Sequence, residues 1–297
     1  MTNKLIDESL RSPVEQLVSK YTRRAWIAKE ARDLTDFACH PAAILSDGGY
    51  SVFAKFSDAA DGAEQFEIEL AGLRILSSRA GVLIPTPIGI IQVQEGTILV
   101  LEATQAVERG PREWRDIGRT LAQIHKVKGD QFGLESNGYF GALPQDNATM
   151  SDWSEFYAER RLRPMLKRAV DSGHMPTDLT RQIEKVISHL PGLCGPAVVP
   201  TLLHGDAQQN NFISTEKGAM VIDPAVYFGH PEMDLAYIDY FQPVPEDVFD
   251  GYRKELPIDP GFPERRALWR IWGYLAAVTV DGNGYLGRLT EAVKHYL

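Results

Sequence analysis

Two short polar segments follow apolar runs in the second half of the chain. The first, "LLHGDAQQNNF" (202–212), contains Asp206 and Asn211, and the second, "VIDP" (221–224), contains Asp223. Hard Mg²⁺ prefers oxygen ligands such as an Asn amide and an Asp carboxylate, and divalent metal neutralises the charge that develops on ATP's phosphates. These residue types predict phosphoryl transfer, in which Asn211 and Asp223 bind the metal and Asp206 accepts the proton of the acceptor.

The spacing of these three residues favours the same interpretation. Asn211 follows Asp206 by five positions and Asp223 follows Asn211 by twelve. Protein kinases show this spacing in their catalytic loop and in the metal-binding segment that follows it. Taken singly, each residue also fits ordinary turn chemistry, so the prediction depends on the combination.

A kinase of this design also needs a strand lysine on the α- and β-phosphates, oriented by a helix glutamate. The segment "SVFAKF" (51–56) supplies Lys55, and "FEIEL" (66–70) supplies Glu69 in the correct order. Glu67 is the alternative partner, but the apolar stripe of its segment places it more outward. Lys55 and Glu69 are therefore the predicted pair.

The elements that must hold these residues follow from the hydrophobic periodicity. Helical spacing predicts an opening helix over 13–31 and a second helix over 64–78. Residues 42–56 and 82–104 each contain two apolar runs separated by a glycine-containing turn, which is typical of a β-hairpin. The order strand, strand, helix, strand, strand indicates a small sheet-rich unit before residue 104.

Beyond Thr104 the pattern is mostly helical, with apolar stripes over 112–127, 153–170, 177–190 and 265–280. The predicted fold is α+β, with a small sheet-rich lobe that precedes a larger helical one. A β-rich nucleotide-binding lobe would span 1–103, and a larger, mostly helical lobe that binds the acceptor and performs catalysis would span 104–297.

Composition excludes several classes of partner. The formal net charge is −9, so the chain has no long-range attraction for nucleic acid or an anionic membrane. No apolar run approaches the roughly 18 residues of a membrane helix. The two cysteines, Cys39 and Cys194, lack the number and spacing of a disulfide framework or a zinc site. We expect a complete cytoplasmic protein whose partners are small molecules or proteins, as a monomer or a dimer.

One basic segment, "ERRLRPMLKR" (159–168), could suggest nucleic acid, but no stacking aromatics are interleaved among its basic residues. A solvated helix face is the prediction there. Trp153 and Tyr157, just before it, could line an acceptor pocket, although an aromatic stripe at helical spacing is more often core. His204 is expected to form structural hydrogen bonds, because the predicted mechanism needs no histidine base.

Several long stretches make the chain resemble the fructosamine-3-kinase (ketosamine kinase) family, which is related to the aminoglycoside and choline phosphotransferases. The stretches are "LLHGD", "VIDPAVYFGHPEMDLA", "FGLESNGYFGALPQDN", "WSEFYAERRLRP" and "LPIDPGF". The resemblance implies a protein-kinase-like bilobal fold. It also implies ATP- and Mg²⁺-dependent phosphorylation of a sugar hydroxyl on a ketosamine, such as a fructosamine, a ribulosamine or another glycated amine.

The resemblance also implies roles for individual residues. Asp206 would be the base, and the residues that bind ATP and metal would be Lys55, Glu69, Asn211 and Asp223. Adenine would face the backbone of Leu101, Glu102 and Ala103. Asp234 would support the catalytic loop from below.

The chain departs from the family pattern in three places. The family's turn Gly-Gly-Cys-Ile-Asn is replaced by residues 37–41, "FACHP", which should weaken a phosphate cradle because two glycines are lost and proline has no N–H. The family's Leu-Trp-Ser-Gly is replaced by residues 207–210, "AQQN", so Gln208 stands beside the acceptor and points to a different or more polar substrate. The segment "AAVTVDGNGY" lacks the family's usual His and Asn residues.

Two alternatives remain open from the sequence. The first is a kinase of the same fold that acts on an aminoglycoside, a choline-like amine or another hydroxylated acceptor. The second is a nucleotide-binding pseudokinase, which the loss of the glycine-rich turn favours.

Overall fold

The structure, a computed structural model, describes residues 5–6, 8–35 and 40–297. Its first part contains a five-stranded antiparallel sheet with strand order β1-β2-β3-β5-β4. The strands are β1 (Glu30–Asp33), β2 (Ala42–Ser46), β3 (Ser51–Ser57), β4 (Pro87–Val93) and β5 (Gly96–Glu102). Both predicted hairpins, β2–β3 and β4–β5, are confirmed.

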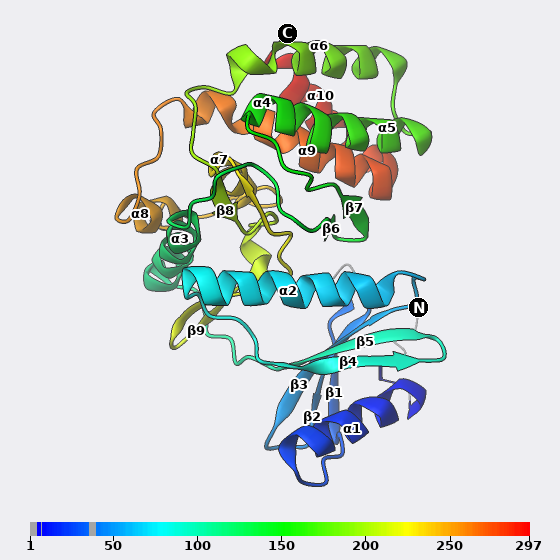
Figure 1. Ribbon diagram of the computed structural model, residues 1–297. Coiled ribbons are helices and arrows are strands. Elements are labelled where there is room, and N and C mark those ends of the chain that lie inside the picture. Colours follow the sequence, from blue (N-terminus) through cyan, green and yellow to red (C-terminus); the bar gives the residue numbers. More distant parts are fainter. Residues whose placement is uncertain (1–4, 7, 36–39) are drawn as a thin grey trace.

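Two helices cover opposite faces of this sheet, α1 (Glu8–Thr22) and α2 (Gly62–Ala80) (Figure 1). The alternation of side chains along β5 explains both contacts, because successive residues of a strand point to opposite faces. Ile98 and Val100 belong to the cluster that contains the apolar residues of α1, whereas Leu99 and Leu101 pack with those of α2. The inner strand β5 is therefore buried on both faces of the sheet.

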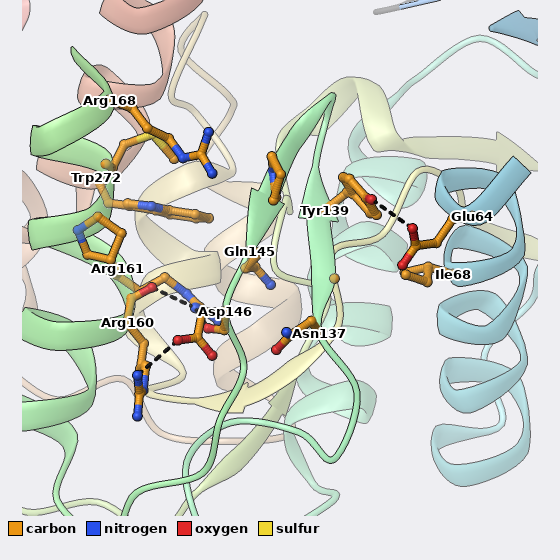
Figure 2. A pocket seen from close by; sticks show the side chains of 14 residues that line it. Glu64, Ile68, Asn137, Tyr139, Gln145, Asp146, Arg160, Arg161, Arg168 and Trp272 are labelled. Atoms are coloured by element: carbon orange, nitrogen blue, oxygen red, sulfur yellow. Dashed lines mark hydrogen bonds and ion pairs between the residues drawn. The ribbon is translucent and has the colours of Figure 1, made fainter. Parts of the chain in front are cut away.

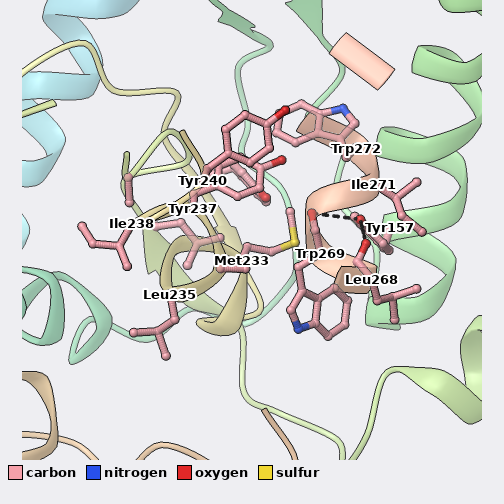
Figure 3. Packing of buried hydrophobic residues seen from close by; sticks show 14 of the residues in the cluster. Tyr157, Met233, Leu235, Tyr237, Ile238, Tyr240, Leu268, Trp269, Ile271 and Trp272 are labelled. Carbon is pink, nitrogen blue, oxygen red and sulfur yellow. Dashed lines mark hydrogen bonds between the residues drawn. The ribbon is translucent and has the colours of Figure 1, made fainter. Parts of the chain in front are cut away.

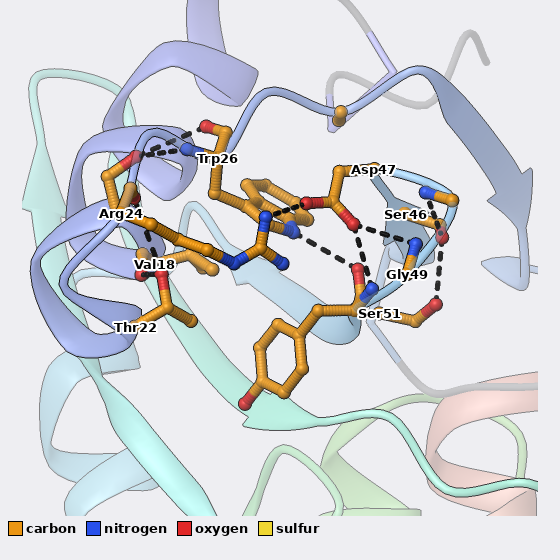
Figure 4. A network of polar contacts seen from close by, with 12 residues as sticks. Val18, Thr22, Arg24, Trp26, Ser46, Asp47, Gly49 and Ser51 are labelled. Carbon is orange, nitrogen blue, oxygen red and sulfur yellow. Dashed lines mark hydrogen bonds and ion pairs between the residues drawn. The ribbon is translucent and has the colours of Figure 1, made fainter.

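The turn between β2 and β3 is held by the side chain of Asp47 (Figure 4). Asp47 Oδ1 accepts hydrogen bonds from the amides of Gly49, at 2.9 Å, and Tyr50, at 2.7 Å, and Asp47 Oδ2 lies 2.6 Å from Arg24. The hydrogen bond from Arg24 and those two amides lower the pKa of Asp47 to about 2. Gly48 takes the positive φ of 95° that the turn requires. The hairpin is thereby tied to the segment that follows α1.

The opening helix differs from its prediction. The apolar stripe predicts a helix over 13–31, but α1 ends at Thr22, where Arg23 adopts a left-handed φ of 56°. Residues 30–33 form the edge strand β1, which pairs antiparallel with β2. The helical periodicity is weak at the end of this segment, so pairing with the edge of the sheet determines its conformation there.

The rest of the chain is mostly helical, as predicted, and α2 lies between it and the sheet (Figure 1). The helical elements are α3 (Pro111–His125), α4 (Trp153–Phe156), the π-helix η2 (Tyr157–Leu162), α5 (Arg163–Asp171), α6 (Thr177–Leu193), the 3₁₀ turn η3 (Gln209–Asn211), α7 (Glu232–Tyr237), α8 (Asp247–Arg253), α9 (Phe262–Asp281), η4 (Gly282–Tyr285) and α10 (Leu286–Lys294). The α+β fold, with a sheet-rich part followed by a mainly helical part, is confirmed.

Three short antiparallel ladders lie inside the helical part. Their strands are β6 (Gly138–Phe140), β7 (Leu143–Gln145), β8 (Thr201–Leu203), β9 (Phe212–Thr215), β10 (Gly218–Val221) and β11 (Tyr227–Gly229). β8 pairs with β11 and β9 pairs with β10. These two pairings bring the segments 201–212 and 218–229 together.

Aromatic side chains of α7 and α9 form the centre of the helical part (Figure 3). Trp269 is fully buried and Trp272 is 1% exposed, and Tyr237 stacks on Trp272 with ring centroids 6.2 Å apart. Their packing fixes α9 against α7. Among the described helices, none is both long and apolar enough to cross a membrane.

Candidate active site

The two short ladders place the predicted catalytic residues at their ends. Asp206 follows β8, Asn211 ends the 3₁₀ turn before β9, and Asp223 lies between β10 and β11. The Asn211 amide nitrogen donates to Asp206 Oδ2 at 2.9 Å and to the Asp206 carbonyl oxygen at 2.8 Å. The five-residue spacing thus closes a small loop in which the Asn211 side chain orients the carboxylate.

The carboxyl group of Asp206 has an unusual proton affinity. Burial raises its pKa to about 7, although the hydrogen bond from Asn211 opposes this shift. A carboxylate whose pKa lies near neutral pH is suited to accept and release a proton at that pH.

A buried network supports the loop from below. Both carboxylate oxygens of Asp234 accept backbone hydrogen bonds, Oδ2 from the amide of His204 at 2.7 Å and Oδ1 from that of Gly205 at 3.0 Å. His125 Nε2 lies 3.1 Å from Asp234 Oδ2, and its Nδ1 lies 2.9 Å from the Tyr252 hydroxyl. Asp234 and His125 are both fully buried. This network fixes the backbone immediately before Asp206.

His204 joins the loop to the segment that carries Asp223. Its Nε2 donates to the Ile222 carbonyl oxygen at 3.0 Å, and its Nδ1 accepts from the Asp206 amide at 3.3 Å. Burial lowers the pKa of His204, so the imidazole is neutral and can serve as donor and acceptor at once. The side chain lies between the two segments and forms the kind of structural hydrogen bonds that the sequence predicts.

Lys55 on β3 contacts two carboxylates. Its Nζ lies 2.7 Å from Glu69 Oε2 on α2 and 2.7 Å from Asp223 Oδ1. Glu67, the rejected alternative, is exposed. The sheet, the long helix α2 and the segment between β10 and β11 therefore meet at one ammonium group.

The two carboxylates differ in their electrostatics. Burial raises the pKa of Glu69 to about 7, although Lys55 opposes this shift. Burial acts in the same direction on Asp223, but the charge of Lys55 outweighs it and holds the pKa of Asp223 below its usual value. The same surroundings raise the pKa of Lys55, because the two carboxylates outweigh its burial. Of the two carboxyl groups, Asp223 is therefore the more acidic.

Asp223 also has a left-handed backbone, with φ of 51°, which is uncommon for a residue other than glycine. Such conformations cost free energy and persist where the surrounding structure over-determines them. The pairings on either side of Asp223, in β10 and β11, provide that constraint.

A pocket of about 80 Å³ opens at this meeting point. Its lining includes the predicted Lys55, Glu69, Asp206, Gln208, Asn211 and Asp223. Gln208, expected beside the acceptor, therefore shares the pocket with the predicted base.

The oxygen atoms in this pocket suit Mg²⁺. Magnesium keeps several waters and usually takes only one or two protein carboxylates in addition to substrate phosphates. Asn211 uses its amide nitrogen on Asp206, so the amide oxygen is the atom that remains for a cation, and the Asp223 side chain is 37% exposed. Within the described ranges, no group of three or more His, Cys, Asp or Glu side chains is placed to hold a metal. The donor set fits a metal that is bound together with nucleotide phosphates.

The segment expected to face adenine ends β5, but two of its amides are already bonded. The amide of Glu102 donates to Thr86 O at 2.8 Å, and that of Ala103 donates to Ser51 O at 3.0 Å. Leu101 is 3% exposed and packs against α2. An adenine that accepts hydrogen bonds from these amides must first displace the backbone partners.

The altered turn at residues 37–41 is described only from His40 onward, and Phe37, Ala38 and Cys39 lie outside the described residues. His40 lines the pocket of about 80 Å³, and its Nε2 lies 3.2 Å from Gln65 Oε1. Burial lowers the pKa of His40. An imidazole therefore stands at the end of the segment where the family has a glycine-rich turn.

Trp153 and Tyr157 are not brought to this pocket. Trp153 is 6% exposed, and its ring stacks on that of Tyr157 with centroids 5.5 Å apart. The Tyr157 hydroxyl donates to the carbonyl oxygen of Leu268 at 2.8 Å (Figure 3). Both side chains belong to the helical core, which is the ordinary place for an aromatic stripe.

A second and larger cavity lies beside the first and was not expected from the sequence. It has a volume of about 320 Å³, and Arg160, Arg161, Arg168 and Trp272 are among its lining residues (Figure 2). The only sequence signal was the basic run at 159–168. The prediction of a solvated face there is wrong for Arg161, which is fully buried.

Solved structures define the class of this fold. The chain matches an aminoglycoside phosphotransferase in ternary complex with AMP-PNP and hygromycin B, with a TM-score of 0.61 and 15% identity over 96% of this chain and 98% of that one. It matches a choline kinase from Streptococcus pneumoniae with a TM-score of 0.61 and 15% identity, over 97% of this chain and 98% of that one. The fold is therefore that of the small-molecule kinases related to protein kinases.

Sequence comparisons define the family within that class. A profile of the fructosamine kinase family matches residues 11–297. A protein named probable ketoamine kinase from Synechocystis is 29% identical, over 96% of each chain. The chloroplastic protein-ribulosamine 3-kinase of Arabidopsis thaliana is 31% identical, over 85% of this chain and 77% of that protein. A crystal structure assigned as a fructosamine-3-kinase from Thermobifida fusca has a TM-score of 0.82 and 30% identity, over 95% of this chain and 98% of that one. The chain belongs to the fructosamine kinase family, and the resemblance stated from its motifs is confirmed.

Proposed function

We propose that this chain uses Mg·ATP to phosphorylate a sugar hydroxyl of a small ketosamine, a fructosamine or a ribulosamine. The observation that carries the proposal is the meeting of Lys55, Asp206 and Asp223 in one pocket, with Asn211 bonded to Asp206. Residues 1–103 would bind the nucleotide, and residues 104–297 would bind the acceptor and supply the catalytic loop.

In the proposed reaction Asp206 accepts the proton of the acceptor hydroxyl, and Asn211 keeps the Asp206 carboxylate oriented toward that hydroxyl. Lys55 would bind the α- and β-phosphates, and Glu69 would hold the Lys55 side chain in place. Asn211 and Asp223 would hold Mg²⁺, which supplies charge neutralisation on the phosphates. Most of the rate would come from positioning and electrostatic stabilisation, because little covalent chemistry falls to the protein.

The AMP-PNP in the related aminoglycoside phosphotransferase supports ATP as the phosphoryl donor. The names of the relatives support a ketosamine as the acceptor. A free, buried Cys194 supports a reducing compartment, and we infer a cytoplasmic location.

Gln208 favours a second candidate, a kinase of the same fold for an aminoglycoside, a choline-like amine or another hydroxylated acceptor. The family's tryptophan beside the acceptor is replaced here by an amide, which offers hydrogen bonds rather than an apolar face. The bonded amides of Glu102 and Ala103 favour a third candidate, a pseudokinase that binds nucleotide without transfer.

An acceptor panel with Mg·ATP separates these candidates. The wild-type protein is incubated with a fructosamine, a ribulosamine, an aminoglycoside and choline, and phosphorylated products are identified by mass. We expect product from a ketosamine. Product from choline or the aminoglycoside alone favours the second candidate, and thermal stabilisation by nucleotide with no product at all favours the third.

A further inference from the structure

Two arginines of the second cavity lie on a π-helical segment, η2 (Tyr157–Leu162). The amide of Arg163 donates to the carbonyl oxygen of Ala158, five residues earlier. Such π-helical insertions into an α-helix are rare overall, but those that occur are often found at functional sites. The extra residue in the turn changes the directions in which the neighbouring side chains point. Here Arg160 and Arg161, which are adjacent in sequence, both line the same cavity.

Arg161 is a buried cation without a matching carboxylate. Its side chain is fully buried, and no carboxylate among the described residues lies within 4.0 Å of it. Its guanidinium donates to Asp146 O at 2.6 Å and to Asn147 Oδ1 at 2.7 Å, and its Nε has no acceptor within the described part of the chain. A buried charge that is paired only with neutral acceptors is costly, so an anion in the adjoining cavity would stabilise it.

Aromatic rings offset part of this charge on one side. The Arg161 guanidinium carbon lies 4.0 Å from the centre of the Tyr227 ring, 4.7 Å from that of Phe156 and 5.5 Å from that of Trp272. The negative faces of these rings attract a cation. They also hold the guanidinium in one position, so that it is preorganised for a ligand on the cavity side.

The cavity as a whole has an excess of positive charge. Three arginines and two carboxylates, Glu64 and Asp146, line it. Asp146 is already paired with Arg160 at 2.9 Å, and Glu64 Oε2 accepts a hydrogen bond from the Tyr139 hydroxyl at 3.3 Å (Figure 2). No ion pair engages Arg168 among the described residues, and its side chain is exposed. In a chain with a formal net charge of −9, this local excess is unexpected.

The cavity adjoins the active-site pocket. Ile68 and Tyr139 line both, and the Gln145 amide, in the second cavity, donates at 3.4 Å to the carbonyl oxygen of Ala225, in the first. A ligand with its hydroxyl at Asp206 could therefore extend past Tyr139 to the arginines. We propose that the cavity lined by Arg160, Arg161 and Arg168 binds a carboxylate or phosphate group carried by the acceptor, an inference that rests on the proposed function for the identity of that acceptor.

Three matched ketosamines test this subsite. The fructose adducts of propylamine, β-alanine and 2-aminoethyl phosphate share one sugar and a similar chain length, and they end in a methyl, a carboxylate and a phosphate group. Their dissociation constants are measured by calorimetry with the full chain, without nucleotide. We expect at least one anionic adduct to bind about tenfold more tightly than the propylamine adduct. The tighter of the two anionic adducts identifies the group that the site prefers.

Variants assign the preference to this cavity. Arg168→Glu should abolish the advantage of the anionic adducts and leave the affinity for the propylamine adduct unchanged. Lys167→Glu is the matched control, because Lys167 is the adjacent cation on the same helix, is 75% exposed, pairs with Asp171 and does not line the cavity. Since Arg168 is exposed, its replacement does not disturb the core.

The outcomes separate this inference from the proposed function. Equal wild-type affinities for the three adducts, or equal losses in the Arg168 and Lys167 variants, would overturn the anion site alone. No binding of any adduct would overturn the anion site together with the proposed function. If the anionic adducts bind tightly and depend on Arg168, but none is phosphorylated with Mg·ATP, the anion site stands and the proposed function fails.

Discussion

The ammonium group of Lys55 lies 2.7 Å from the carboxylate of Asp223, although 168 positions separate the two residues in the chain. Glu69 completes the contact from α2, so three distant elements are joined at one buried cation. In the proposed function the nucleotide phosphates would contact Lys55 and the metal would contact Asp223, so both ligands would meet at this ion pair. The site is thereby held in a charged, compact arrangement that suits a ligand with both negative charge and a divalent cation.

Replacing Lys55 by methionine should destabilise the protein, because two adjacent carboxyl groups lose their common partner. Breaking a buried ion pair costs about 3 kcal/mol at the low end of its range, and the partial exposure of Asp223 favours this low end. The free energy of unfolding, measured with urea, should fall by that amount.

The matched control for this variant is Lys126→Met. Lys126 lies 2.6 Å from Glu255, but both side chains are well exposed, at 49% and 37%. An exposed pair contributes less than about 1 kcal/mol. If the free energy of unfolding falls equally in the two variants, the ion pairs of Lys55 with Glu69 and Asp223 do not stabilise the fold as described above.

Replacing Asp206 by asparagine should remove the base and keep the shape of the loop. The expected loss in kcat is about 10²- to 10⁴-fold, the usual contribution of a general base, with the KM for ATP little changed. Steady-state rates with the preferred ketosamine measure both constants. Unchanged turnover would exclude Asp206 from the reaction.

The raised pKa of Asp206, about 7, predicts how stability depends on pH. An unfolded aspartate has a pKa of about 3.9, so between roughly pH 4 and 7 the folded state binds more protons than the unfolded state. The contribution of Asp206 to the free energy of unfolding is therefore complete below about pH 4 and decreases as the pH rises to about 7.

The Asp206→Asn variant has no proton to lose at this position and should escape this decrease. It should unfold at the same urea concentration as the wild type near pH 4 and at a higher one at pH 8. Because Asp206 is partly exposed, we expect a gain of only about 1–2 kcal/mol. A variant that is equally stable at pH 8 would contradict the raised pKa.

Gly205 is required at its position by both its backbone and its surroundings. Its φ is 83°, and a Cβ there would lie 2.0 Å from the carbonyl oxygen of Ala225. Gly205→Ala should destabilise the protein by about 3 kcal/mol or more and lower kcat by moving Asp206. Gly287→Ala is the control, since a Cβ on this α10 residue meets nothing within 4 Å, and it should be neutral or slightly stabilising. Similar unfolding curves for the two variants would refute the packing argument.

The local features of the site could be predicted from the sequence because they depend on short spacings. The interval from Asp206 to Asn211 and the helical phase of Glu69 are visible in a few residues. The contact between Lys55 and Asp223 depends on how the sheet and the helical part pack together, and no periodicity encodes it. The expectation that these two residues share one site came from the residue types and order that a kinase requires, and the family resemblance added to it.

The features that were missed have short or ambiguous signals. β8 and β11 have three residues each, too few for a strand period to appear. The basic run at 159–168 predicts a solvated helix face, but the π-helical segment and three aromatic rings place Arg161 in the interior. Such burial depends on residues from distant segments, Tyr227 and Trp272 among them.

The most direct test of the central claim follows the γ-phosphoryl group of ATP. The wild-type protein and the Asp206→Asn variant are incubated side by side with ATP labelled at the γ-phosphate, Mg²⁺ and a fructosamine, and the labelled products are separated. The account predicts that wild type places label on the ketosamine in step with ADP formation, and that the variant does so about 10²- to 10⁴-fold more slowly. Label found only in inorganic phosphate, or equal transfer by the two proteins, would contradict it.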